Sequence, residues 1–197
     1  MSHLLVGVAG LNASGKSSVC NHLRDAHGFT VLSLSDAIRD ELAAHSLATT
    51  RENLLATGNQ LRNAHGAGVL AERTLAKLRA QLAQQSATAP PLRFCIDSIR
   101  HPGEVAALRQ FDGTFRLVAV ACDAATRFAR LQERGRAGDC ATLADFQRIE
   151  RAELANPDPL GQQVSLVQDM ADIQLSNDAD IDTLLRDLDK KLGLGDT

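Results

Sequence analysis

The chain has 197 residues, a length that fits one α/β domain and can bury a core without disulfides or metals. Its formal net charge of -3 and its lack of tryptophan and tyrosine argue against polymeric nucleic acid as a partner, because proteins that bind it carry basic surfaces and stacking aromatics. No apolar run approaches the length of a membrane span and the start lacks a cleavable leader, so we expect a cytoplasmic protein with no membrane partner.

The first predicted elements surround a glycine-rich loop. The apolar run Leu4–Ala9 predicts a strand, and residues 18–27 predict a helix. Between them, residues 10–17 read G-L-N-A-S-G-K-S, which matches the phosphate-loop pattern G-x-x-x-x-G-K-[ST] in the strand, loop and helix context that this motif requires. We therefore predict that the chain binds a nucleoside triphosphate. ATP is preferred over GTP because the sequence contains no N-K-x-D element for reading guanine.

The parts of this loop have separate predicted roles. Gly10 and Gly15 can take backbone conformations barred to residues with a Cβ atom, so successive N–H groups can turn toward phosphate oxygens. Lys16 is predicted to reach the β- and γ-phosphates, and the Ser17 hydroxyl is predicted to ligate Mg²⁺. The predicted nucleotide-binding residues of the loop are Gly10, Asn12, Ala13, Ser14, Gly15, Lys16, Ser17 and Ser18.

Further apolar runs, rich in Val, Ile, Leu and Phe, predict strands over residues 29–34, 94–96, 115–121 and 173–175. Stretches with helical spacing separate these runs. We therefore expect a P-loop NTPase fold, a three-layer sandwich in which a five-stranded parallel sheet is covered by helices on both faces. Such sheets bind ligands at the carboxyl ends of their strands, where the glycine-rich loop also lies.

The longest interval between predicted strands is too long for a single crossover helix, and we treat residues 35–91 as a helical insertion. One helix is expected over residues 36–45, and one or two more between residues 51 and 85. Two glycines and a histidine around residues 63–68 predict a bend or loop inside the insertion.

Two segments at predicted strand ends each pair an aspartate with an arginine. Asp36 and Arg39 lie one helical turn apart beyond the second strand, and Asp97 and Arg100 follow the third. A carboxylate there could hold water on Mg²⁺ or accept a hydroxyl proton, while the arginines could grip an acceptor phosphate. The alternatives are that Asp36 is only a helix N-cap and that Asp97 is only a turn residue.

Arginines with helical spacing follow the fourth predicted strand. Arg127, Arg130 and Arg134 would share one helix face, and Arg136 follows them closely. Phosphoryl transfer needs several fixed donors for its negative oxygens, so these arginines favour a kinase over a simple binding module. The alternative is a solvated helix face paired with acidic residues, namely Glu133, Glu150 and Glu153.

Over nearly its whole length the sequence resembles the P-loop kinases of the adenylate kinase and dephospho-CoA kinase superfamily. It is especially similar to an uncharacterised adenylate-kinase-like branch that is related to deoxynucleotide kinases. The matching motifs are residues 10–17, S-D-A-I-R over 35–39, R-E-N over 51–53, Leu61 and Arg62 with Gly66 and Gly68, D-S-I-R over 97–100 with P-G-E-V over 102–105, and residues 127–136. The sequence departs from this pattern at Ser98, where many relatives have glycine.

This resemblance implies that residues 35–91 bind the acceptor and that residues 124–159 form an arginine-rich lid. The implied acceptor-binding residues are Asp36, Arg39, Arg62, Asp97 and Arg100. The implied catalytic residues are Lys16, Asp36, Arg130 and Arg134, and the expected metal ligands are Ser17 and Asp97. Arg127 and Asn177 are expected to contact the bound nucleotide, Asn177 in a loop that resembles the one contacting the adenine edge.

These features predict a kinase that uses ATP and Mg²⁺ to phosphorylate a small-molecule acceptor, a nucleoside or deoxynucleoside monophosphate. A dephospho-CoA kinase is the nearest alternative, and it would make Asp36 a general base. A nucleotide-dependent regulatory ATPase without a small acceptor is a third possibility. The oligomer is expected to be a monomer or homodimer. His45, His65 and His101 are expected to be polar surface or loop groups, because transfer to an anionic acceptor needs little proton chemistry. Of the three, His101 is the candidate for an exception, because it adjoins Arg100.

Overall fold

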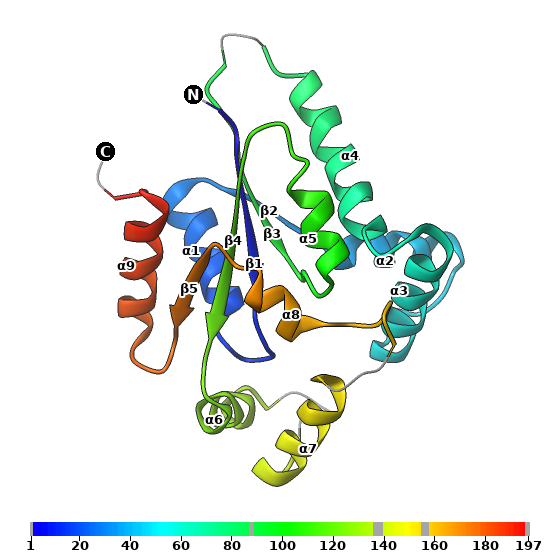
Figure 1. Cartoon of the computed structure of the whole chain (residues 1–197), viewed down its shortest axis with the longest axis vertical. Helices are drawn as coiled ribbons and strands as arrows, with labels where there is room; N and C mark the ends of the chain where they lie inside the picture. Colours follow the sequence, from blue (N-terminus) through cyan, green and yellow to red (C-terminus); the bar gives the residue numbers. More distant parts are fainter. Residues whose placement is uncertain (1, 87–88, 136–139, 155–157, 196–197) are drawn as a thin grey trace.

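A computed structural model describes residues 2–86, 89–135, 140–154 and 158–195 (Figure 1). The strands of its sheet are β1 (Leu4–Ala9), β2 (Thr30–Ser33), β3 (Arg93–Asp97), β4 (Thr114–Ala121) and β5 (Ile173–Ser176). The helices of the described part are α1 (Lys16–His27), α2 (Leu34–Ala44), α3 (Arg51–His65), α4 (Val69–Ala83), α5 (Pro102–Leu108), α6 (Ala124–Arg134), α7 (Leu143–Leu154), α8 (Val164–Asp169) and α9 (Ile181–Leu192).

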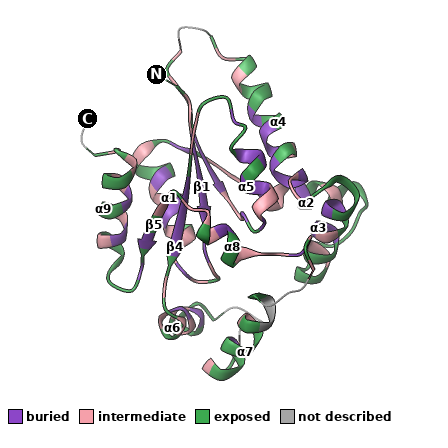
Figure 2. Ribbon diagram, in the orientation of Figure 1, coloured by how far each residue is buried: buried purple, intermediate pink, exposed green. Residues whose placement is uncertain are grey.

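The sheet has the order β2-β3-β1-β4-β5, and every neighbouring pair is parallel. Successive residues of β1 serve opposite faces: Leu5 and Ala9 join the core under α4, α5 and α8, whereas Val6 and Val8 join the core under α1 and α9. Figure 2 shows the strands buried between these two layers. These two covering layers and the parallel sheet confirm the predicted three-layer fold. A parallel sheet with apolar residues on both faces must be covered on both.

The observed strands begin and end within one residue of the predicted apolar runs. The helix after β2 begins earlier than predicted, at Leu34, because Ser33 and Asp36 form a capping box. The Ser33 hydroxyl accepts a hydrogen bond from the backbone N–H of Ser35, and the Asp36 carboxylate accepts one from the N–H of Ser33. Asp36 therefore helps to cap α2 from its first turn and is not itself the N-cap residue.

The predicted insertion consists of α2, α3 and α4. The bend inside it is shorter than predicted, because α3 continues to His65 and α4 begins at Val69. At the carboxyl edge of the sheet, α6 and α7 lie beyond the ends of β4 and β5, and α7 is largely exposed (Figures 1 and 2). Among the described helices, none combines the length and apolar character needed to cross a membrane.

Candidate functional site

The loop between β1 and α1 has the conformation that its glycines allow. Gly10 has a φ of 151°, and a Cβ atom there would lie 2.6 Å from the backbone oxygen of Val120. Gly15 has a φ of 108°, and a Cβ atom there would lie 2.1 Å from Nδ2 of Asn177. Both positions therefore require glycine, and the loop packs directly against residues that follow or end β4 and β5.

Lys16 begins α1 and points back into the loop. Its Nζ donates a 2.7 Å hydrogen bond to the backbone oxygen of Leu11. The pKa of Lys16 is lowered to about 8, mainly by burial, while the Asp97 carboxylate opposes the shift and the nearby Arg100 and Arg127 add to it. The charges that act on this amine thus come from both sides of the loop, from the segment after β3 and from α6.

This pKa predicts that ATP affinity falls in alkaline solution. Below about pH 8 the Lys16 amine of the free protein is already protonated. Above that pH the amine must take up a proton from solution before it can pair with the bound phosphates. The apparent Kd for Mg-ATP is then expected to rise by about tenfold per pH unit above that point. Calorimetry in two buffers of different ionisation enthalpy measures the proton uptake, and an affinity that is flat between about pH 7 and about pH 9 would contradict the role of Lys16.

Asn177 supports the loop from the end of β5. Its side chain is 2 % exposed, and Nδ2 donates a 2.8 Å hydrogen bond to the backbone oxygen of Ser14. Arg130 in turn donates from Nη2 to the backbone oxygen of Asn177 at 3.0 Å. The structure therefore places the Asn177 amide behind the loop, where it holds the backbone that would surround the phosphates, and Arg130 holds Asn177.

The arginines of α6 occupy different environments. Arg127 is buried and forms a bidentate ion pair with Glu150 of α7, with Nη2 and Oε2 2.7 Å apart. Its guanidinium carbon lies 5.3 Å from the ring centroid of Phe146, also in α7. The pairing with Glu150 matches one part of the alternative to phosphate binding, but Arg127 is 3 % exposed and does not lie on a solvated helix face. Arg134 is the exposed last residue of α6, and Arg136 lies outside the described residues.

Helix α7 lies close to the phosphate loop. A cavity of about 30 Å³ is lined by Leu11 of the loop, by Glu150 and Leu154 of α7, and by Gln162 and Val164. Glu150 of α7 therefore lies beside Leu11 of the loop as well as against Arg127 of α6.

Asp97, the last residue of β3, has an unsatisfied carboxylate oxygen. Among the described residues no hydrogen-bond donor reaches its buried Oδ1, whereas Oδ2 accepts a 3.4 Å bond from the hydroxyl of Ser98. Ser98 has a φ of 66°, in the left-handed region that favours glycine, so a serine at this position holds a strained backbone conformation. An orphaned carboxylate oxygen on a residue whose charge acts on the Lys16 amine fits a site for Mg²⁺ or a water bound to it.

Asp36 and Arg39 lie on α2, just beyond the end of β2, next to the end of β3. Ser33 and Asp97 are paired in the sheet register, so the two segments begin side by side. Arg39 Nη1 donates a 2.7 Å hydrogen bond to Asp36 Oδ1, and both side chains are about half exposed. The two residues thus lie one helical turn apart, as predicted, and their side chains are open to solvent at the carboxyl edge of the sheet.

Arg100 and Arg62 are held by one buried carboxylate, Glu104. Its Oε2 accepts 2.7 Å and 3.1 Å bonds from the backbone N–H groups of Arg100 and His101, and its Oε1 accepts from Nη2 of Arg62 at 3.2 Å. Arg62, a predicted acceptor-binding residue, is 3 % exposed, and its guanidinium contacts Glu104. Arg100 is exposed, and its Nη1 donates to Gln162 at 2.8 Å.

His101 was expected among surface or loop groups, but it is 6 % exposed. Its Nδ1 accepts a 2.9 Å bond from the N–H of Gly103, and its Nε2 donates a 2.8 Å bond to the backbone oxygen of Pro159. With Glu104 it forms the capping box of α5. The signal was present in the sequence as H-x-x-E with proline after the histidine, which is a helix-start pattern.

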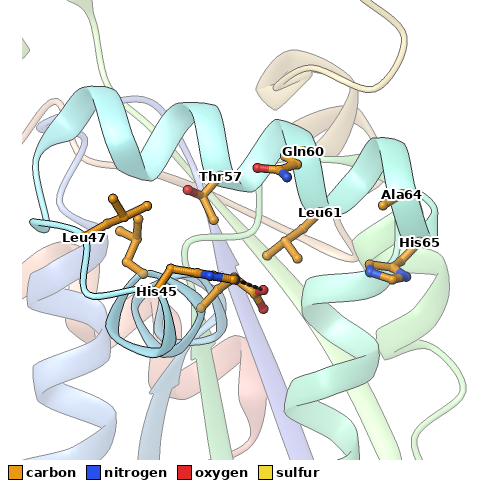
Figure 3. Close-up of a pocket in the computed structure, with 9 residues that line it drawn as sticks. His45, Leu47, Thr57, Gln60, Leu61, Ala64 and His65 are labelled. Atoms are coloured by element: carbon orange, nitrogen blue, oxygen red, sulfur yellow. Dashed lines mark ion pairs between the residues drawn. The ribbon is translucent and has the colours of Figure 1, made fainter.

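A larger cavity, of about 350 Å³, lies between α2 and α3 (Figure 3). Figure 3 shows His45 and Leu47 facing Thr57 and Leu61 of α3 across it, and His45 pairs with Glu41 at 3.3 Å. No residue of the phosphate loop lines this cavity. It lies at the C-terminal end of α2, whereas the Asp36 and Arg39 pair lies in the first turns of that helix.

Comparisons with known proteins agree with this geometry. A family model described as an AAA domain matches residues 6–153. A UPF0200 protein of Hyperthermus butylicus is 33% identical over 173 residues, which cover 88% of this chain and 87% of the relative. Two solved structures are similar in fold. TT1252 from Thermus thermophilus has a TM-score of 0.59 and 19% sequence identity, and the match covers 100% of both chains. The Mycobacterium tuberculosis APS kinase CysC in complex with AMPPNP and APS has a TM-score of 0.52 and 18% sequence identity, and the match covers 98% of both chains. The chain belongs to the AAA domain family and to the UPF0200 proteins.

Proposed function

We propose that this protein is an ATP-dependent small-molecule kinase whose acceptor is a nucleoside or deoxynucleoside monophosphate. One observation carries the proposal: the phosphate loop follows the central strand β1 and has arginine-bearing segments on both sides of it. Arg130 lies on the side of β4 and β5, while Arg39 and Arg100 follow β2 and β3. Two anions, a donor and an acceptor, would then meet near Lys16.

On the donor side, the loop would hold the ATP phosphates and Lys16 would exchange its contact with Leu11 for a phosphate oxygen. The Ser17 hydroxyl and the Asp97 carboxylate would hold Mg²⁺, which neutralises charge on the phosphates when bound. Arg127 would reach the nucleotide by releasing Glu150, and α7 would move with that carboxylate. Residues 124–159 would thus act as the lid of a single kinase domain that spans residues 1–197.

On the acceptor side, Arg39 and Arg100 would grip the monophosphate, and the insertion over residues 35–91 would carry the rest of the molecule. Arg62 would act through Glu104, which fixes the backbone that presents Arg100. Both carboxylate oxygens of Asp36 already accept hydrogen bonds, one from Arg39 and one from Ser33. This arrangement favours a phosphate acceptor over the ribose hydroxyl of dephospho-CoA, since an anionic acceptor needs no general base.

A panel of ribo-, deoxyribo- and modified nucleoside monophosphates, together with dephospho-CoA, tests the proposal in a coupled assay with Mg-ATP. The expected result is ADP release and a nucleoside diphosphate with at least one monophosphate. Turnover with dephospho-CoA alone would favour the alternative kinase. Slow ATP hydrolysis that no acceptor accelerates would instead indicate a regulatory ATPase and contradict the proposal. The oligomer, monomer or homodimer, is measured by light scattering under the same conditions.

Two substitutions separate the acceptor types. With a monophosphate acceptor, Arg39→Ala and Arg100→Ala are each expected to raise the acceptor KM by about tenfold or more, because each removes a charge-assisted contact to phosphate. Arg79→Ala serves as the control, since Arg79 is an exposed arginine of α4 that pairs with Asp112. If Asp36→Asn lowers kcat far more than Arg100→Ala raises KM, Asp36 is a general base and the acceptor is a hydroxyl.

A further inference from the structure

Two histidines and an aspartate converge on one point outside the phosphate-binding edge. His22 and His27 belong to α1, and Asp189 belongs to α9, which packs beside α1 on the same face of the sheet (Figure 1). A helix rises about 1.5 Å per residue, so His27 lies about 16 Å along the axis from Lys16, at the far end of α1. The proposed phosphoryl transfer uses none of these three residues.

The ligand atoms of the three side chains already face one another. His22 Nε2 lies 3.0 Å and 2.9 Å from the two carboxylate oxygens of Asp189, and His27 Nε2 lies 2.8 Å from the first of them. One ligand atom from each residue falls within a group whose members are all within 4.8 Å of one another. The two rings meet edge to face, with their centroids 5.1 Å apart. Both Nε2 atoms lie within 3.0 Å of the same carboxylate oxygen of Asp189.

We propose that His22, His27 and Asp189 bind a divalent transition-metal ion of the zinc class. In a tetrahedral site, metal–ligand bonds of about 2.0–2.1 Å place neighbouring ligand atoms about 3.3 Å apart. The observed nitrogen–oxygen separations of 2.8 to 3.0 Å would need to open only slightly to admit an ion. Each imidazole would bind the ion through the Nε2 lone pair of the tautomer that carries its proton on Nδ1.

The donor set and its exposure define the class of ion. Imidazole nitrogens suit Zn²⁺, Ni²⁺, Cu²⁺ and Fe²⁺, whereas Mg²⁺ and Ca²⁺ prefer oxygen ligands alone. The side chains of His22, His27 and Asp189 are 20%, 15% and 25% exposed, so solvent reaches the cluster and a water can complete the coordination. A bound ion would join α1, the helix that follows the phosphate loop, to the C-terminal helix α9.

Calorimetric titration of the full chain with ZnCl₂ tests the site. The expected result is one equivalent bound, with an affinity that His22→Gln and His27→Gln each weaken by about tenfold or more. His65→Gln is the matched control, because His65 is an exposed histidine at the end of α3, and it is expected to bind as the wild type does. Asp189→Asn provides a third variant, and circular dichroism verifies that each variant is folded before titration.

Cobalt identifies the ligands independently of the affinities. Co²⁺ held by two imidazoles and a carboxylate gives d–d absorption without the intense near-ultraviolet band that thiolate ligation produces, which separates this site from one that uses Cys122. ZnCl₂ is also expected to raise the melting temperature of the wild type but not of His22→Gln or His27→Gln, since an ion that binds only the folded state stabilises it. Equal zinc affinity in the wild type and in both histidine variants would overturn the proposal, and so would a thiolate band. The outcome is independent of the kinase assay.

Discussion

Replacing Lys16 with alanine is expected to weaken ATP binding by about a hundredfold or more, because the variant loses a charge-assisted contact to phosphate in a site shielded from water. The structure places the Lys16 amine inside the loop, 2.7 Å from the backbone oxygen of Leu11. In the nucleotide complex the same amine would turn to a phosphate oxygen. Calorimetric titration with Mg-ATP measures the loss directly.

The same substitution is not expected to unfold the protein. Burial already lowers the pKa of Lys16 to about 8, so the charged amine is an unfavourable group in the free folded state. Below about pH 8 its removal relieves that cost, and the melting temperature should hold or rise slightly. Lys77→Ala is the matched control, since the exposed Lys77 pairs with Asp40 on the surface of the insertion. Unchanged ATP affinity in folded Lys16→Ala would refute the nucleotide site.

The strands and the phosphate loop could be predicted because their signals are local. A buried parallel strand is a short apolar run, so the sequence alone predicts a strand over residues 115–121. The observed strand β4 is Thr114–Ala121. The loop motif lists its own residues in order, and Gly10 and Gly15 have the positive φ angles that such a loop requires. The start of α2 was harder to place, because the Ser33 and Asp36 capping box begins inside the apolar run 29–34 that predicts a strand.

Two pairs of charged side chains that are far apart in the sequence could not be predicted, because their contacts depend on tertiary packing. Arg62 and Glu104 are 42 positions apart, and His22 and Asp189 are 167 apart, yet each pair is in contact. An arginine in a motif looks the same in sequence whether it faces a ligand or a buried carboxylate. Only the contact between α3 and the first turn of α5 shows that Arg62 holds Glu104 and supports Arg100 indirectly.

This buried pair carries the largest stability effect that we expect. Arg62→Met is expected to destabilise the protein by about 3–5 kcal/mol, because it leaves the Glu104 carboxylate buried without its partner. Arg62 is 3 % and Glu104 0 % exposed, so water cannot replace the lost contact. Urea unfolding at neutral pH measures the loss. Arg79→Ala removes an exposed ion pair with Asp112 and is expected to change stability by less than about 1 kcal/mol.

The pH dependence identifies the cause of that loss. Burial raises the pKa of Glu104 above its ordinary value, opposed mainly by Arg62. A carboxyl whose pKa is higher in the folded than in the unfolded state favours folding while protonated, and this contribution is lost as pH rises through the folded pKa. Without Arg62 the pKa of Glu104 rises further, so the deficit of Arg62→Met should shrink as the solution is acidified. Arg62→Met combined with Glu104→Gln should recover much of the stability at neutral pH, because neither charge of the pair then remains buried. A double variant no more stable than Arg62→Met would show that lost packing, and not the unpaired carboxylate, causes the loss of stability.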